Sequence, residues 1–123
     1  MKSIKNISCP CCSKVKYKNC CQPYHKGKIA KTPLELMRSR FTAFAIGDID
    51  YIIKTSTFQN DYDDLKTFSQ NCQFKKLKIL EDTNNSVKFE ATIICDGEDN
   101  SFIEHSFFIQ KDGKWYYDSG EIE

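Results

Sequence analysis

Five of the seven cysteines of this chain lie within thirteen residues, in the stretch CPCCSKVKYKNCC at residues 9–21. Cys9 and Cys11 form one close pair, and Cys20 and Cys21 form a second pair after an eight-residue loop. Two cysteine pairs joined by a short loop can turn four sulfur atoms toward one point, at metal–sulfur distances of about 2.3 Å. We therefore expect all four residues to be ligands of one metal ion, and we call residues 9–21 the knuckle.

The donor type narrows both the metal and its role. Four soft thiolates favour zinc, with iron as the alternative, over magnesium or calcium. Four protein ligands complete a tetrahedral zinc site and leave no position for water or substrate, which predicts a structural rather than a catalytic metal. Disulfides are the competing pairing, but a reducing cytosol disfavours them and seven cysteines leave at least one thiol over.

Two neighbouring residues offer alternative ligands. Cys12 can replace Cys11 in the ligand set or remain a free thiol, and the sequence does not decide between these roles. His25 stands four residues beyond Cys21 and can also compete for the metal.

The length and composition indicate one folded domain with a small appendage. The chain has 123 residues, of which 40% are hydrophobic and 28% charged. No apolar run approaches the roughly 18 residues of a membrane span, so we expect no membrane insertion. The N-terminal MKSIKNIS is followed by no apolar stretch, which is unlike a secretory signal and predicts a cytoplasmic protein.

Charge is distributed unevenly along the chain. Residues 1–31 contain eight lysines and no acid, whereas the remainder holds ten basic residues and all seventeen acids. Such asymmetry is typical of an interaction segment beside a folded body.

Helix signals begin after the knuckle. Thr32, Pro33 and Glu35 form a capping box with a proline at the first helical position, and Gly47 marks the end of that helix. Asp48 can cap a second helix. A third short helix is expected from Asp61, with its apolar residues turned inward: Tyr62, Leu65 and Phe68.

From residue 74 onward the apolar period changes from helical spacing to two. Asn84-Asn85, Asp96-Gly97 and Asp112-Gly113 interrupt these runs as hairpin turns. Helices followed by about four antiparallel strands predict an α+β fold in which the helices cover one face of the sheet.

The knuckle resembles the SEC-C motif, usually CPCGSxxxYxxCC, which is found at the end of the SecA translocation ATPase. Cys12 occupies the place of the motif's glycine, where a positive φ is expected. The other motif positions are matched by Cys9, Pro10, Cys11, Ser13, Tyr17, Cys20 and Cys21.

Two longer stretches resemble the bacterial YchJ-like family. They are CCQPYHKGKIAKTPLELMRSRFTAFAIGDIDYIIKT and EHSFFIQKDGKWYYDSG, and the pairing of MRSR with WYY is their most specific feature. The resemblance implies a nuclear-transport-factor-2-like (cystatin-like) cone of helices on a curved antiparallel sheet. It also implies a division into a metal-binding knuckle with its tether at 1–28 and an α+β domain at 29–123.

Folds of that class enclose a pocket between the helices and the sheet. A single central histidine without a spaced carboxylate pair argues against an enzyme, because acid–base catalysis needs a titratable group held near its partner. The residues that the resemblance places in or near the pocket are Arg38, Arg40, Asp50, Tyr51, His105 and Tyr117.

A cytosolic, zinc-binding interaction module is the function that these features favour. The basic knuckle would dock to a protein or to the ribosome, as the resemblance to SecA's motif implies. Nucleic acid is a less favoured partner, because the acidic body repels phosphates. A small-molecule-binding protein or an enzyme that uses the pocket is the alternative.

Overall fold

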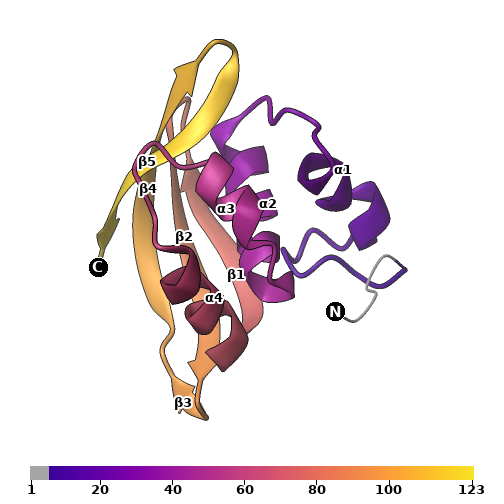
Figure 1. Ribbon diagram of the computed structural model, residues 1–123, viewed down its shortest axis with the longest axis vertical. Helices are drawn as coiled ribbons and strands as arrows, with labels where there is room; N and C mark the ends of the chain where they lie inside the picture. The colour runs from indigo at the N-terminus through magenta and orange to yellow at the C-terminus, as the bar shows by residue number, and fades with distance from the viewer. Residues whose placement is uncertain (1–5) are drawn as a thin grey trace.

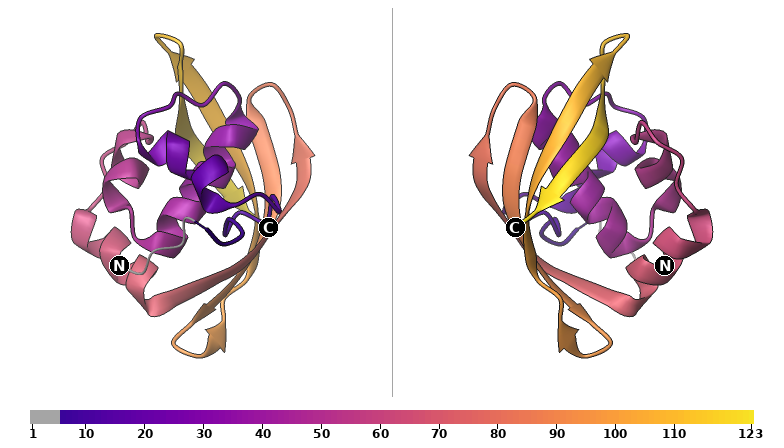
Figure 2. Two further views of the ribbon diagram at one scale, coloured as in Figure 1. Left: turned by 90° about the vertical axis from the view of Figure 1, so that its right-hand side faces the viewer. Right: turned by 90° about the vertical axis from the view of Figure 1, so that its left-hand side faces the viewer.

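The computed structural model describes residues 6–123, in which helices cover one face of a curved antiparallel sheet (Figures 1 and 2). The helical part contains a short 3-10 helix (Tyr17–Asn19), α1 (Gln22–His25), α2 (Pro33–Ile46), α3 (Ile49–Lys54) and α4 (Tyr62–Asn71). The strands are β1 (Cys72–Asp82), β2 (Ser86–Cys95), β3 (Glu98–Asp99), β4 (Phe102–Lys111) and β5 (Lys114–Ile122). The predicted order of helices before strands is therefore confirmed.

The cap of α2 forms in part as the sequence predicts. Thr32 Oγ1 accepts a hydrogen bond from the backbone N–H of Glu35 at 3.1 Å. The Glu35 carboxylate does not return to Thr32; it accepts instead from Lys31 N at 3.0 Å and from the Tyr24 hydroxyl at 2.8 Å. Glu35 thus joins the tether before α2 to the start of that helix.

The four long strands form the predicted antiparallel meander. Their order in the sheet is β1-β2-β4-β5, and the two-residue β3 pairs with β2. Asp96-Gly97 and Asp112-Gly113 have φ angles of 52°, 81°, 51° and 79°. Consecutive left-handed residues match the twist of a two-residue hairpin, which is why Asp-Gly stands at both turns.

The core lies between α2 and the inner face of the sheet. Leu36 and Ile52 are each 1% exposed, and Val87 and Phe89 of β2 belong to the same core. The predicted inward orientation of Tyr62 is wrong, because this first residue of α4 stays 47% exposed. Phe68 contacts the rings of two other phenylalanines yet keeps 38% of its surface exposed.

The segment that contains the knuckle packs on the far side of α2 from the sheet. Figure 1 shows α1 beyond α2, so the sheet, α2 and α1 lie in succession. Within residues 6–123, no helix combines the length and the apolar character needed to cross a bilayer.

Candidate metal centre

The four predicted ligands converge. The Sγ atoms of Cys9, Cys11, Cys20 and Cys21 all lie within 4.8 Å of one another. Cys11 Sγ is 3.6 Å from Cys20 Sγ, which is 3.9 Å from Cys21 Sγ. A tetrahedral ion with metal–sulfur distances of about 2.3 Å separates its sulfurs by about 3.8 Å. The cluster therefore has the dimensions to hold one metal ion.

Local backbone geometry brings the two cysteine pairs together. Cys9 N donates to Val15 O at 2.8 Å and Tyr17 N donates to Ile7 O at 2.9 Å, so the chain folds back as a small hairpin. The 3-10 turn that starts at Tyr17 then returns the second pair, with Cys20 N donating to Tyr17 O at 3.0 Å. Residues of one short segment thus supply all four sulfurs.

Cys12 lies at the tip of this hairpin, outside the sulfur cluster. Its φ is 64°, the left-handed conformation expected from the glycine of the SEC-C motif. Its side chain is exposed, and its Sγ accepts a long hydrogen bond of 3.5 Å from Leu77 N in β1. The structure places Cys12 as a strained turn residue beside the body.

Replacing Cys12 with glycine is expected to stabilise the protein slightly and to leave the metal-to-chain ratio at one. The left-handed conformation costs roughly 1–2 kcal/mol for a residue with a Cβ, and glycine removes this cost. Glycine also loses more conformational entropy on folding, which leaves a net gain in stability of about 0.5 kcal/mol. Elemental analysis and urea unfolding measure the two effects. Cys11→Gly is the matched comparison and should lose the metal. Loss of metal from Cys12→Gly would instead show that Cys12 is a ligand.

His25 also lies outside the cluster, because both of its ring nitrogens have other partners. Nε2 is 2.8 Å from Ser39 O, and since a carbonyl only accepts, Nε2 carries the proton and donates. Nδ1 then accepts from the Tyr17 hydroxyl at 2.7 Å. Burial lowers the pKa of His25 and favours this neutral form. His25 connects the knuckle to α2.

Further contacts fix the cluster against the body. Arg38 Nη1 donates to Cys11 O at 2.8 Å, and Cys9 Sγ lies 3.4 Å from Thr42 Oγ1. Cys11 and Cys21 are at most 1% exposed and belong to the same apolar core as the sheet. The cluster is therefore held in the interface between the knuckle and α2.

All four neighbouring thiols can be ionised together only when a cation balances their negative charge. Hydrogen bonds from Cys21 and Cys9 lower the pKa of Cys11 well below its usual value. Burial raises the pKa of Cys20 to about 11, and the hydrogen bond to Cys11 raises that of Cys21. Metals bind cysteine as the thiolate, so a divalent ion held by all four sulfurs must displace their protons. Metal affinity should consequently fall as the pH is lowered.

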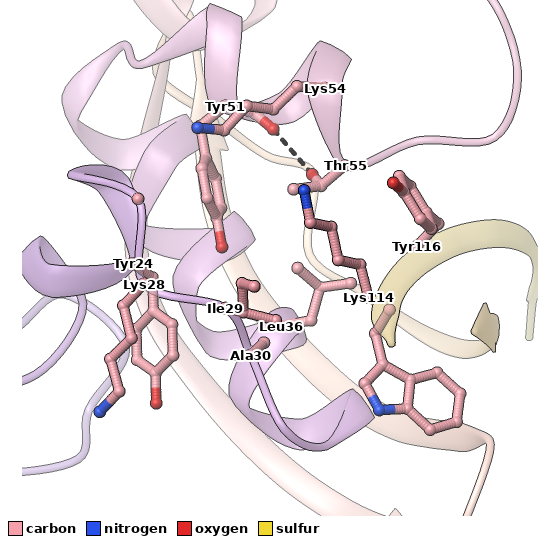
Figure 3. A pocket seen from close by; sticks show the side chains of 12 residues that line it. Tyr24, Lys28, Ile29, Ala30, Leu36, Tyr51, Lys54, Thr55, Lys114 and Tyr116 are labelled. Carbon is pink, nitrogen blue, oxygen red and sulfur yellow. Dashed lines mark hydrogen bonds between the residues drawn. The ribbon is translucent and has the colours of Figure 1, made fainter. Parts of the chain in front are cut away.

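The residues expected in a pocket occupy different places. Arg40 and Tyr117 line a cavity between α2 and the sheet, whereas Arg38 contacts the knuckle and Asp50 is exposed on α3. Ser39 Oγ donates to Leu36 O, so the Tyr51 hydroxyl donates to Ser39 Oγ, at 2.7 Å. Tyr51 also lines a second, open groove of about 210 Å³ (Figure 3).

His105 lies on the outer face of the sheet. Successive residues of a strand point to opposite faces, and its neighbours Glu104 and Ser106 are the ones that line the cavity. The residues that share a face with His105 are the more apolar set, Ile103, Phe107 and Ile109, so the sequence favours the wrong face of β4 as the inner one. Their spacing of two within EHSFF shows that Glu104 and Ser106 share a face, but the sequence does not show that this is the face the helices cover.

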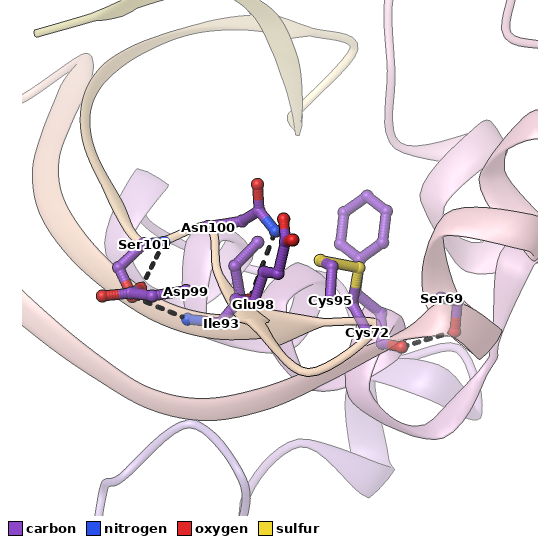
Figure 4. The surroundings of a disulfide bond; sticks show 9 residues. Ser69, Cys72, Ile93, Cys95, Glu98, Asp99, Asn100 and Ser101 are labelled. Carbon is purple, nitrogen blue, oxygen red and sulfur yellow. Dashed lines mark hydrogen bonds between the residues drawn. A yellow bond between two sulfur atoms is a disulfide. The ribbon is translucent and has the colours of Figure 1, made fainter.

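The remaining two cysteines form a disulfide in the body. Cys72 and Cys95 face each other at the ends of β1 and β2, and their sulfurs are bonded (Figure 4). A reducing cytosol, as expected from the sequence, disfavours disulfides, and the sequence does not show that the strand register places these two residues directly opposite each other.

Replacing both Cys72 and Cys95 with alanine is expected to lower the free energy of unfolding by about 2 kcal/mol. The bond spans 23 residues, and releasing it gives entropy back to the unfolded chain. Urea unfolding of the metal-loaded protein measures the loss, while the metal content should not change. An unchanged unfolding midpoint, together with two extra reactive thiols in the wild type, would count against the bond.

Comparison with known proteins agrees with this architecture. The family model described as "YchJ, middle NTF2-like domain" matches residues 32–120. The chain belongs to the YchJ family. A UPF0225 protein of Deinococcus radiodurans is 37% identical over 89% of this chain and 85% of the relative. The UPF0225 protein YchJ of Shigella dysenteriae is 37% identical over 91% and 81%, respectively.

Two solved structures share the fold of this family member. A SEC-C motif containing protein from Rhodopseudomonas palustris superposes with a TM-score of 0.83 and 31% identity, covering 94% of this chain and 98% of the other. A sec-c motif containing protein from Psychrobacter arcticus superposes with a TM-score of 0.79 and 21% identity, covering 98% of this chain and 85% of the other. The predicted YchJ-like membership and the nuclear-transport-factor-2-like fold are confirmed.

Proposed function

We propose that this protein is a zinc-binding interaction module that docks to a protein or ribosomal partner through the outward face of its knuckle. One observation carries the proposal: the two sides of the knuckle differ in what they expose. Its sulfur side is buried against α2, whereas Lys14, Lys16 and Lys18 are exposed. Ile7 and Val15 on the same hairpin are 55% and 43% exposed.

The outward face combines charge with apolar surface on a rigid support. Three lysines attract an acidic partner, and two aliphatic side chains can bury area against it. The backbone beneath them is held by the hairpin hydrogen bonds, by Arg38 and by His25. A partner that binds this face orders little additional chain, which favours affinity.

A second group of lysines extends the basic surface to the junction with the body. Lys28, Lys54 and Lys114 line the open groove, beside Tyr24 and Trp115 (Figure 3). Within residues 6–123 the one ion pair is Lys88–Glu123, so these three lysines have no internal carboxylate partner. These lysines favour a partner that carries acidic groups.

Zinc is the metal we propose, because four thiolates at tetrahedral spacing suit its structural sites. The cytoplasm is the proposed location, since unoxidised cysteines persist there as metal ligands. The Cys72–Cys95 bond supports an oxidising environment instead. Alkylation of thiols in intact cells, followed by mass measurement, shows whether Cys72 and Cys95 are reduced there. Reduced thiols are the result that a cytoplasmic location predicts.

A capture experiment tests the docking surface. The full chain, loaded with zinc, is compared with a Lys14, Lys16 and Lys18 triple serine variant and with Cys20→Ser, Cys21→Ser. We expect both variants to lose at least tenfold in partner recovery. The matched control replaces three exposed lysines of β1 with serine: Lys75, Lys76 and Lys78.

The control keeps the same change in net charge at another site. If all variants recover the same partners as the wild type, docking through the knuckle is refuted. Co-sedimentation with purified ribosomes, before and after ribonuclease treatment, separates a ribosomal partner from a free protein.

A further inference from the structure

A largely apolar cavity of about 300 Å³ lies between α2, α4 and the inner face of the sheet. Its volume is at the lower end of the roughly 300–1,000 Å³ typical of small-molecule sites. Aromatic rings form most of its wall: Phe41, Phe44, Phe68, Phe74, Phe89 and Phe102. Such a wall suits an apolar ligand, and an unfilled space of this size would forfeit packing contacts.

One part of the wall is polar and contains a buried guanidinium. Arg40 is 7% exposed, and its Nη1 donates to Ile52 O at 3.1 Å, Thr55 Oγ1 at 2.7 Å and Ser56 Oγ at 3.1 Å. Within the described chain its Nε and Nη2 donate no hydrogen bond, and no carboxylate forms an ion pair with it. Burial lowers the pKa of Arg40 to about 10, which leaves it charged at neutral pH.

Glu104 supplies the opposite charge in the same wall. Its Oε2 accepts from the Ser106 hydroxyl at 2.5 Å and from the Tyr117 hydroxyl at 3.0 Å. Among residues 6–123, its Oε1 has no hydrogen-bond partner. Burial raises the pKa of Tyr117, so its hydroxyl remains a donor.

The backbone makes room for this carboxylate. Gly120 of β5 lies opposite Ser106 of β4, and a Cβ at Gly120 would collide with Glu104 Oε2 and the Tyr117 hydroxyl. A glycine at this strand position leaves space that a side chain would remove. The carboxylate is therefore held by two donors and by the shape of the strand beside it.

We propose that this cavity binds a small, mainly apolar molecule whose polar end is uncharged and offers an acceptor to Arg40 and a donor to Glu104. Primary amides and related groups carry this pair of functions. An anion would be attracted by Arg40 but repelled by Glu104, and a cation the reverse, so a charged head would lose its hydration for little net attraction. A neutral head satisfies both free groups without adding charge.

This site is independent of the knuckle and of the docking proposed above. Arg40 belongs to MRSR, Glu104 and Ser106 to EHSFF, and Tyr117 to WYY, the segments by which the chain resembles its family. The tertiary fold brings these three separate segments to one wall.

Titration of the zinc-loaded full chain with three probes tests the proposal, observed by two-dimensional NMR of backbone amides. The probes are 4-methylbenzamide, 4-methylbenzoate and 4-methylbenzylamine. We expect 4-methylbenzamide to shift the amides of Phe89, Phe102 and Tyr117 and to bind at least tenfold more tightly than the two charged probes. Equal binding of all three, or no shift at these residues at millimolar concentration, would overturn the proposal.

Two variants sharpen the test. Glu104→Gln removes the negative charge and should abolish the preference for the amide over the anion, because 4-methylbenzoate should bind at least tenfold more tightly than it does to the wild type. Glu90→Gln, on the exposed face of β2, is the matched control and should retain the wild-type order. A Glu104→Gln protein that keeps the wild-type preference would refute the assigned role of Glu104.

A cavity-filling change gives an independent readout. Ala91→Leu adds side-chain volume at a lining position that is 2% exposed and should abolish binding of every probe. Its dispersed NMR spectrum shows whether it folds, and the Glu104→Gln result stands if it does not. The lysine variants of the knuckle should bind 4-methylbenzamide normally, which separates this proposal from docking.

Discussion

Substituting serine for Cys21 is expected to abolish metal binding and to unfold the knuckle. Cys21 is 1% exposed, and its sulfur is one of four within 4.8 Å of one another. Structural zinc sites in small motifs contribute apparent free energies of about 10–16 kcal/mol at neutral pH. Losing one of four thiolates should lower metal affinity at least a thousandfold, so that the variant loses its metal during dialysis.

The body should lose stability together with the metal. Cys9, Cys11 and Tyr17 belong to the same core as Leu36, so an unfolded knuckle exposes one side of α2. Elemental analysis after dialysis measures the metal-to-chain ratio, and amide exchange in α2 reports the loss of protection.

Cys12→Ser is the matched control for this substitution. It makes the same chemical change at an exposed sulfur outside the cluster and should keep one metal per chain. A Cys21→Ser protein with one firmly held metal would refute the four-sulfur centre.

Replacing Arg40 with methionine is expected to lower the free energy of unfolding by about 4 kcal/mol. Its guanidinium ties α2 to the end of α3 through three hydrogen bonds, and each bond to a charged group is worth about 1.5–3 kcal/mol, although not additively. The guanidinium also lies 4.6 Å from the ring centre of Tyr117, which pairs with residues 55–57. Urea unfolding of the metal-loaded chain measures the effect.

Arg38→Met is the comparison that locates this effect. Within residues 6–123, Arg38 makes one hydrogen bond, to the carbonyl of Cys11, so its loss should cost about 1.5 kcal/mol and weaken metal retention. Equal losses in both variants, with equal metal content, would contradict the separate roles. Among residues 6–123 neither arginine forms an ion pair: Asp50 is exposed, and the Glu35 carboxylate accepts from Tyr24 and Lys31 instead.

Features that depend on neighbouring residues could be predicted from the sequence. The close pairs at Cys9 and Cys20, the cap at Thr32 and the turn at Asp112-Gly113 each follow from local geometry. A thiolate pair, a side-chain cap or a left-handed turn forms within a few residues, so its pattern can be read directly. Strand periodicity likewise predicted the meander.

Contacts between residues far apart in the chain could not be predicted, because they depend on how the whole fold packs. Alternation in β4 shows that Glu104 and His105 point to opposite faces, but not which face the helices cover. The helices cover the face of Glu104, and this places its carboxylate in one wall with Arg40 and Tyr117. The pairing of Cys72 with Cys95 similarly depends on strand register. Such contacts join residues far apart in sequence, and the packing of the whole chain selects them.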